Sequence, residues 1–514
     1  MTTASNKQKN ILLIPIQDNL SHVGVRYLHY TLLENDFRSN LLYLPYLDLN
    51  DSNKAKHVVD FISRMDPLYV GLSLTSLVFN NARDLSIFLK KHFPELTIIW
   101  GGVHPTIDPD SCMPYADYVM LGESEKSIID FSSALTSGED IKDVPNLCYQ
   151  ENGQIKKNPL CSAIEDLDTL PWFDHIPKNS YMQRRDGQIY NLDRDLYHKE
   201  ARFQGRVYEM LSSRGCAFSC TYCSNNFFNK LYHSNKKVRR RSIENIIGEF
   251  EQMVKNDPEI KLVVFHDESF LICSTEYIRE FCKAYKEKIN KPFLVRVTPT
   301  SINEEKLILL KEAGVSWVSA GLQSGSDEVN QKVYKRRASK KDFMQAANLL
   351  KKHNIAGKYD VILDNPFESE SNTIETIETL METPKPYIIE FFSLTFLPGT
   401  ELYDRVQTEC PEKMEDCKTK DYMGFKKSYL NKLTVLAVYL PQALMKKLLQ
   451  LYKADSNGST IFKFTFNVSS LLSAAYYKPK TLMQLLKLSC GNSYLKAAKM
   501  IPLYIKDYFA VRNF

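Results

Sequence analysis

The chain has 514 residues, which is too long for one ordinary hydrophobic core and predicts about three domains. Hydrophobic residues make up 44% and charged residues 25% of the sequence, a balance that excludes a fibrous or an intrinsically disordered protein. The net charge of +5 hides an asymmetry, because the segment from Lys418 onward holds 16 basic and three acidic residues (+13), and the rest carries −8.

The first residues do not have the pattern of a targeting segment. A polar lead is followed by the short apolar run NILLIPI, which is too short for the core of a signal peptide. No stretch approaches the ~18 consecutive apolar residues of a membrane span. We therefore expect a cytoplasmic protein, whose 11 cysteines are free, buried or metal-bound rather than paired in disulfides.

Between residues 10 and 137, short apolar runs alternate with amphipathic stretches. The runs predict strands and read NILLIPI, NLLYLP, LYVGLSL, LTIIWGG and DYVMLG, with helices expected over 22–33, 57–65 and 80–92. This alternation predicts a doubly wound, Rossmann-like parallel sheet in a domain of residues 1–140, which would bind ligands beyond the carboxyl ends of its strands. The informative residues follow those strands, and ordinary turns explain the glycines among them equally well: Ser73, Thr75, Gly101, Gly102, Gly122 and Glu123.

Residues 141–204 are rich in Pro, Asn and Asp and predict a connector along the surface. From residue 205 to about 410 a second alternation begins, with strands expected at VYEMLSS, KLVVFHD, FLVRVT, SWVSAGLQS, AGKYDVIL and IIEFFSLTF. Helices are expected between them, for example over 243–254, 277–289, 304–313 and 340–352. Six such repeats predict a partial TIM-type (β/α)6 barrel with its site at the carboxyl ends of the strands. Residues 411–514 predict a helical, basic region.

Three cysteines, Cys216, Cys220 and Cys223, follow the first barrel strand within eight residues. Thiolates are soft ligands, so zinc and an iron-sulfur cluster are the metals to consider. Structural zinc takes four ligands, usually as two pairs, and no second cysteine pair exists here, although His233 or His266 could complete a site. We favour a cubane cluster, in which three cysteines leave one iron open for a substrate or cofactor.

The spacing C-x3-C-x2-C, with Tyr222 before the last cysteine, resembles the cluster loop of radical S-adenosylmethionine enzymes. In that family the open iron binds the amino and carboxylate groups of S-adenosylmethionine, and an electron from the cluster generates a 5'-deoxyadenosyl radical. The resemblance implies that Cys216, Cys220 and Cys223 bind a [4Fe-4S] cluster.

Further segments at the strand ends resemble the same family. FHDESF is similar to the segment that contacts the amino group of the cofactor, and GLQSGSDE has Gln323 where an acid is common. Lys335, Arg336 and Arg337 lie where the family often places a cation near the carboxylate, and the pattern does not choose among them. YDVILDNPFE and LPGTEL resemble the segments that flank adenine. The resemblance implies S-adenosylmethionine contacts from Tyr222, Asp267, Glu268, Gln323, Arg336, Asn365, Pro398 and Gly399.

The first domain resembles the cobalamin-binding domain that precedes the barrel in one large class of this family. The similar segments are VGLSLTS, IIWGGVHPT and YVMLGESE, and they imply cobalamin contacts from Ser73, Thr75, Gly101, Gly102, Gly122 and Glu123. The motif D-x-H-x-x-G, which supplies a lower axial histidine, is not matched, because Asp18 and His22 are four residues apart. We interpret His22 as the cap of the first helix.

Two basic segments allow other interpretations. KKVRRRS (236–242) has clustered cations but no interleaved aromatic residues and ends in Ser242, a good helix N-cap, so we expect a structural or solvated element and no nucleic acid. LTVLAVYLPQALMKKLLQLYK and SYLKAAKMIPLYIKDYFAVRNF combine apolar faces with lysines, as interfacial membrane helices do. Helices that cap the barrel would have the same pattern, so peripheral membrane contact and a cap are equally good interpretations.

The leading hypothesis is a cobalamin-dependent radical S-adenosylmethionine enzyme that methylates an unactivated carbon of a small-molecule or lipid-like substrate. It would need an electron donor such as flavodoxin or ferredoxin, and no catalytic side chain is predicted. A cyclase or rearrangement enzyme with the same cofactors is one alternative, and a sensor that only binds them is another. Transfer-RNA methylthiotransferases resemble the chain less, because their first domain carries three cysteines of its own.

Overall fold

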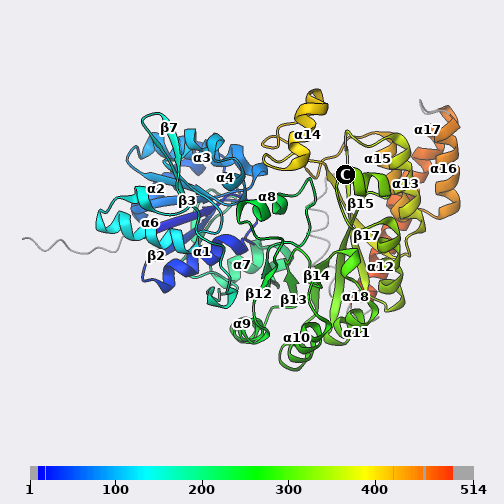
Figure 1. The fold of residues 1–514 in the computed structure, drawn as a ribbon, viewed down its shortest axis with the longest axis horizontal. Coiled ribbons are helices and arrows are strands. Elements are labelled where there is room, and N and C mark those ends of the chain that lie inside the picture. Colours follow the sequence, from blue (N-terminus) through cyan, green and yellow to red (C-terminus); the bar gives the residue numbers. More distant parts are fainter. Residues whose placement is uncertain (1–9, 18, 421, 455–458, 490–514) are drawn as a thin grey trace, which may run out of the picture.

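The computed structural model describes residues 10–17, 19–420, 422–454 and 459–489. It contains two large sheets, one in each half of the chain, followed by a group of helices (Figure 1). Within these described ranges, no helix is both long and apolar enough to cross a membrane. Both sheets were predicted from the sequence, and the structure confirms the fold class.

The first sheet has nine strands in the order β7-β6-β5-β4-β3-β1-β2-β8-β9. Its central strands are all parallel, and β1 lies between β2 and β3. These strands are β1 (Asn10–Pro15), β2 (Arg38–Tyr43), β3 (Pro67–Ser73), β4 (Thr97–Gly101) and β5 (Tyr118–Met120). The order 2-1-3-4-5 reverses direction between β1 and β3, and a crevice for ligands is expected beyond the carboxyl ends of these two strands.

Helices cover both faces of this sheet. The six helices are α1 (Val23–Glu34), α2 (Ser52–Met65), α3 (Phe79–His92), α4 (Val103–Ile107), α5 (Pro109–Cys112) and α6 (Glu125–Ser137). One hydrophobic cluster includes Val58 of α2 and Leu85 of α3, and another includes Val25 of α1 and Phe131 of α6. Apolar side chains on both faces of each strand explain why the strands read as continuous hydrophobic runs.

The stretch 141–204 does more than connect the two halves, because it adds a hairpin to each edge of the first sheet. β6 (Leu147–Glu151) and β7 (Gln154–Lys157) extend it beyond β5, and β8 (Ser180–Gln183) and β9 (Ile189–Asn191) extend it beyond β2. The turn Asn152-Gly153 has positive φ at both residues, as a two-residue hairpin requires. The pairs Asn-Gly and Asp186-Gly187 were therefore a sequence signal for these hairpins. The short helix α7 (Arg194–Glu200) follows.

The second sheet has six parallel strands in the order β10-β13-β14-β15-β16-β17, which is the predicted partial barrel. Its strands are β10 (Val207–Met210), β13 (Leu262–Phe265), β14 (Phe293–Val297), β15 (Val315–Gln323), β16 (Ala356–Leu363) and β17 (Tyr387–Ser393). The helices that accompany them are α9 (Ile243–Asn256), α10 (Thr275–Lys288), α11 (Glu304–Ala313), α12 (Lys340–Lys352), α13 (Glu370–Glu382) and α14 (Glu401–Glu409). The Ser242 hydroxyl caps α9, as its sequence indicates.

A two-stranded antiparallel ribbon brackets the cysteine segment. β11 (Ser213–Arg214) directly precedes the cysteines, and β12 (Arg239–Arg240) follows helix α8 (Ser224–Leu231). The ribbon closes residues 215–238 into a long loop at the carboxyl end of β10. The basic segment 236–242 is structural, because Arg240 donates to the Ile272 carbonyl oxygen at 2.7 Å and Arg241 pairs with Glu249 at 2.5 Å.

The helices after residue 420 pack against the barrel. They are α15 (Tyr429–Tyr439), α16 (Gln442–Ala454), α17 (Thr460–Leu472) and α18 (Lys478–Ser489). The buried faces of α15 and α16 join the barrel core, and Leu485 of α18 packs with Trp317 of β15 and Ala356 of β16. The segment LTVLAVYLPQALMKKLLQLYK is thus a cap on the barrel, whereas SYLKAAKMIPLYIKDYFAVRNF lies outside the described residues.

A buried ion pair between Arg241 and helix α9 gives a test of how the barrel core is stabilised. The Arg241 and Glu249 side chains are 1% and 0% exposed, and the Tyr208 hydroxyl also donates to Glu249 at 2.5 Å. Glu249→Leu leaves a buried guanidinium unpaired, so we expect a loss of about 3–5 kcal/mol in stability, seen as a lower apparent Tm. The matched control is Glu251→Leu on the same helix, whose half-exposed pair with Lys288 should cost about 0–1 kcal/mol. Equal Tm values for the two variants would contradict this assignment.

Candidate functional site

The cysteine loop is held by the barrel segments that follow β15 and β17. The Thr221 amide donates to the carbonyl oxygen of Tyr334 at 3.1 Å, and the Leu402 amide donates to the carbonyl oxygen of Thr221 at 3.0 Å. From within α8, the Asn229 side-chain amide donates to the Cys216 carbonyl oxygen at 2.9 Å. Three separate elements therefore position the loop at the carboxyl edge of the barrel.

The three thiols are half-buried, and burial raises their pKa values. The pKa of Cys216 is raised to about 11 and that of Cys223 to about 12, with the nearby Glu268 carboxylate adding to both shifts. A metal centre would bind the thiolates and displace these protons. In the ranges that the structure describes, no three His, Cys, Asp or Glu side chains converge on a point for one ion. A cubane cluster makes no such demand, since each thiolate binds a different iron, so the trio fits that group.

The adjacent acids Asp267 and Glu268 have different surroundings. The Asp267 side chain is 0% exposed and accepts hydrogen bonds from the Ser212 amide and hydroxyl, at 3.1 and 2.7 Å, and from the Ser213 hydroxyl. It therefore secures the chain before the cysteine loop, and the cofactor contact that the resemblance implied for it stays a prediction. Glu268 is exposed, faces a cavity and acts on the pKa of all three thiols.

The structure distinguishes the three candidate cations. Lys335 forms an ion pair with Glu401 on the surface, and Arg337 is exposed. Arg336 instead donates to the carbonyl oxygens of Gly321 and Leu322 at 2.9 and 3.0 Å, and its charge lowers the pKa of Cys220 against the larger effect of burial. Arg336 is thus the cation of the three whose charge reaches the cysteine loop.

Other residues implied by the barrel motifs are Tyr222 within the loop and Gln323 and Asn365 at or just after the ends of two barrel strands. Gln323 ends β15 with a φ of 64°, and its amide lies over Gly321. The Tyr222 ring packs edge-on against Tyr334, with centroids 5.0 Å apart. Asn365 is buried after β16.

The segment LPGTEL lies directly against helix α8, which follows the three cysteines. A Cβ atom added at Gly399 would come within 2.6 Å of the Phe227 ring on α8, and Gly399 has a φ of 74°. Both features require glycine, and Pro398 precedes it half-buried in the same turn. This glycine therefore allows the last barrel loop to approach the cysteine loop closely.

A cavity of about 350 Å³ lies between the carboxyl edge of the first sheet and helix α8. Five of the six residues predicted for cobalamin line it, namely Ser73, Gly101, Gly102, Gly122 and Glu123. Thr75 does not, because it begins the short turn after β3. From the barrel half, Arg214, Asn225, Tyr232 and Glu268 line the same cavity.

Several cavity residues were not predicted. Gly24, Val25 and Leu28 of α1 line the cavity together with Thr106, whose hydroxyl accepts a hydrogen bond from the Gly122 amide at 2.9 Å. The sequence signal for α1 was Gly24, a glycine in the first turn of a helix. The apolar wall and the exposed glycine backbone suit a large, flat cofactor such as cobalamin.

His22 occupies the N-cap position of α1, as expected, but its imidazole makes no capping hydrogen bond. Burial and the Arg26 charge lower the pKa of His22 to about 3, and its Nε2 atom is buried without a partner. His22 is not among the residues that line the cavity. Asp18 lies outside the described residues.

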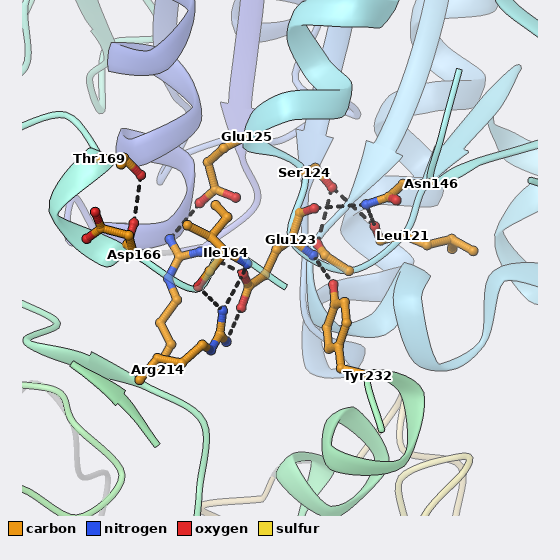
Figure 2. A network of polar contacts seen from close by, with 12 residues as sticks. Leu121, Glu123, Ser124, Glu125, Asn146, Ile164, Asp166, Thr169, Arg214 and Tyr232 are labelled. Carbon is orange, nitrogen blue, oxygen red and sulfur yellow. Dashed lines mark hydrogen bonds and ion pairs between the residues drawn. The ribbon is translucent and has the colours of Figure 1, made fainter. Parts of the chain in front are cut away.

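Glu123 is the centre of an ion-pair network between the two halves of the molecule (Figure 2). Its carboxylate lies 2.5 Å from Arg239 and 3.5 Å from Arg214, both on the ribbon that brackets the cysteine loop. It also accepts a hydrogen bond from the Ile164 amide at 3.0 Å. The Glu123 amide donates to the Tyr232 hydroxyl at 2.5 Å. Burial alone would raise the pKa of Glu123, but the two arginines outweigh it and the pKa is lowered.

Comparison with known families agrees with this arrangement. The model of the B12 binding domain matches residues 9–131, and the model of the radical SAM superfamily matches residues 210–380. The first match covers β1 to β5 and the second covers β13 to β16, and residues of both matched segments line the cavity. The chain is a cobalamin-dependent radical S-adenosylmethionine enzyme. Its cofactors are therefore a [4Fe-4S] cluster, S-adenosylmethionine and cobalamin.

Relatives of the enzyme carry out more than one reaction. An uncharacterized methyltransferase of Pyrococcus horikoshii is 25% identical over 362 residues, which are 70% of this chain and 72% of the relative. The anaerobic magnesium-protoporphyrin IX monomethyl ester cyclase of Rubrivivax gelatinosus is 26% identical over 63% of this chain, and the match spans only 54% of the cyclase. The solved structure of the cobalamin-dependent radical enzyme OxsB has a TM-score of 0.67 at 14% identity, over 98% of this chain and 82% of OxsB, which shows a shared fold.

The Glu123 network predicts how the two halves are held together. Glu123→Gln removes the carboxylate that pairs closely with Arg239, whereas Arg214 keeps its 2.5 Å pair with Glu125. Because the Arg239 charge is then left without a carboxylate, we expect amides of β11 and β12 to exchange hydrogen about 10- to 100-fold faster. Because the pKa of Glu123 is lowered, the wild-type network should persist at neutral pH and weaken only as the pH falls below about 4.3.

The control is Glu165→Gln, which removes an exposed pair with Lys237 in the neighbouring loop and should leave exchange unchanged. Unchanged exchange in Glu123→Gln would show that other contacts hold the halves together.

Proposed function

We propose that the enzyme transfers a methyl group from cobalamin to an unactivated carbon of a small-molecule or lipid-like substrate. The supporting observation is the shared cavity, which the strand-end loops of the first sheet and Glu268 beside the cysteine loop both line. A methyl donor in those loops and a radical at the barrel edge would then face one substrate. An external donor, such as flavodoxin or ferredoxin, would supply the electron that reduces the cluster.

Each cofactor would be held by residues of matching chemistry. Cys216, Cys220 and Cys223 would bind the cluster. Glu268 would accept hydrogen bonds from the amino group of S-adenosylmethionine, and the Arg336 charge would attract its carboxylate. Together the bound cofactors supply a hydrogen-abstracting radical and a methyl group.

The other proposed contacts come from the surrounding loops. On the cluster side, Tyr222, Gln323, Asn365, Pro398 and Gly399 would border S-adenosylmethionine. On the cobalamin side, Ser73, Gly101, Gly102, Gly122 and the backbone of Glu123 would border the macrocycle.

The cavity wall would shield this chemistry from water. Leu13, Val25, Leu28, Ile99 and Ile128 line the side that belongs to the first sheet. An apolar wall excludes water and keeps side reactions of a radical infrequent. Gly102 keeps this wall close to the β3 loop, because a Cβ atom there would lie 2.8 Å from the carbonyl oxygen of Leu74.

The mass of the product tests methyl transfer. The enzyme, loaded anaerobically with its cofactors and a strong reductant, should give a product heavier than its substrate by one CH2 unit, together with 5'-deoxyadenosine. Ala in place of Cys216, Cys220 and Cys223 should remove the cluster absorbance and both products, whereas Cys410→Ala, outside the loop, should retain them.

A product without added carbon would favour the second candidate, a cyclase or rearrangement enzyme, which the Rubrivivax relative supports. Cofactor binding without any turnover of S-adenosylmethionine would favour a sensor.

Glu268 gives a sharper test of cofactor binding. Glu268→Gln removes a charge beside the proposed amino group, so we expect the Kd for S-adenosylmethionine to rise about tenfold or more with unchanged iron content. Asp267→Asn is the contrasting variant, because it disturbs the buried bonds to Ser212 and should lower the apparent Tm. An unchanged Kd in Glu268→Gln would remove Glu268 from the proposed site.

A further inference from the structure

The structure contains one helix, α17, that is apolar on two opposite faces. Its inner face holds Phe462 and Phe466, which are 0% and 6% exposed. Both rings pack edge-on against Tyr429, with centroids 5.1 and 5.4 Å away, and Phe462 also contacts Tyr452. This inner face accounts for how α17 is attached to the rest of the molecule.

The outer face of α17 is an apolar stripe of five residues: Ile461, Phe464, Val468, Leu471 and Leu472. Ile461, Phe464 and Leu471 are 67%, 70% and 72% exposed. The spacings of three, four, three and one residues place all five on one side of a helix. Tyr476, in the turn that follows, is also exposed.

Large exposed apolar side chains elsewhere in the described ranges are isolated. They are Ile87, Tyr190, Ile308, Tyr422 and Met483, and each lies on a different segment of the chain. Single exposed apolar residues are normal on protein surfaces, whereas a contiguous stripe marks a surface that binds something. The fold of the described chain leaves this stripe uncovered.

The charge around the stripe identifies the ligand. Between residues 422 and 489 the only acidic residue in the sequence is Asp455. Lys463 on α17 and Lys480 on α18 are exposed, as are Lys446 and Lys447 on α16. A second copy of this chain would bring like charges together across the stripe, which opposes self-association. An apolar helix face among lysines fits the interface of an anionic bilayer.

We propose that the outer face of α17 binds the surface of a membrane that contains anionic lipids. The helix would lie in the interface, with Phe464 and Leu471 among the acyl chains and the lysines at the phosphate groups. In Figure 1, α16 and α17 lie at the end of the molecule opposite the first sheet. Membrane contact through α17 therefore leaves the cavity between the two halves uncovered, and the proposal does not depend on which reaction occurs there.

Vesicle flotation of the full-length enzyme tests this surface. We expect binding to vesicles of phosphatidylglycerol and phosphatidylcholine, weaker binding at high salt, and little binding to phosphatidylcholine alone. The double variant Phe464→Ser/Leu471→Ser should reduce the partition coefficient by about tenfold or more, because it removes two apolar side chains that would enter the bilayer. The control is Ile308→Ser, a 41% exposed position on α11, which should bind as the wild type does.

A variant that removes charge separates the electrostatic contribution to binding from the apolar one. Lys463→Gln/Lys480→Gln should weaken binding to the anionic vesicles and leave the apolar stripe intact. Iron content and circular dichroism equal to those of the wild type would show that the variants fold.

Three outcomes would overturn the proposal: no flotation of the wild type, equal flotation of Phe464→Ser/Leu471→Ser, or a wild-type dimer that this variant dissociates without any binding to vesicles. The last outcome would assign the stripe to self-association.

Discussion

The pairing of two carboxylates, Glu123 and Glu125, with two arginines holds the two halves of this enzyme in register. Glu123 follows β5 of the first sheet, and Arg214 and Arg239 lie on the ribbon that brackets the cysteine loop. Burying these four charges is costly unless each finds a partner, so the ribbon and the strand-end loop must meet in one arrangement. That arrangement places the cysteine loop beside the cobalamin half and leaves the cavity between them.

Because the two halves meet at the cavity, some residues there line the cavity and others hold the halves together. Gly122 has a φ of 67°, and a Cβ atom there would collide with the Tyr232 hydroxyl, so this glycine permits contact between the halves as well as lining the cavity. Asp267 and Glu268 divide in the same way, since one carboxylate is buried against Ser212 and the other faces the cavity. A loop at such a junction uses alternate side chains for structure and for ligands.

The helices after the barrel also have one set of side chains in the core and another at the surface. Leu485 of α18 packs on Trp317 in the barrel, and Phe462 of α17 fills the core beside Tyr429, so these helices are part of the fold. The outward stripe of α17 contributes nothing to that core. Apolar side chains that do not stabilise the fold cost solubility, and a bound lipid surface would compensate for this cost.

Much of the fold and part of the site could be predicted from residue patterns alone. Apolar runs that alternate with amphipathic stretches predicted both sheets, because strands buried on both faces are continuously hydrophobic. The spacing of Cys216, Cys220 and Cys223 indicated a cluster, since thiolate chemistry and close spacing are local properties. The hairpins of residues 141–204 were missed, although Asn152-Gly153 marked one turn, because their strands are short and polar.

Only the tertiary structure decided which strand-end residues face the cavity. Thr75 and Ser73 are two residues apart, yet only Ser73 lines it, and of Lys335, Arg336 and Arg337 only Arg336 turns toward the cysteine loop. The pairing of Glu123 with Arg239 joins residues 116 positions apart. The sequence by itself determined the elements and the metal-binding chemistry, because these depend on local periodicity and residue type. The direction of each side chain was decided by packing between distant segments, which no local pattern records.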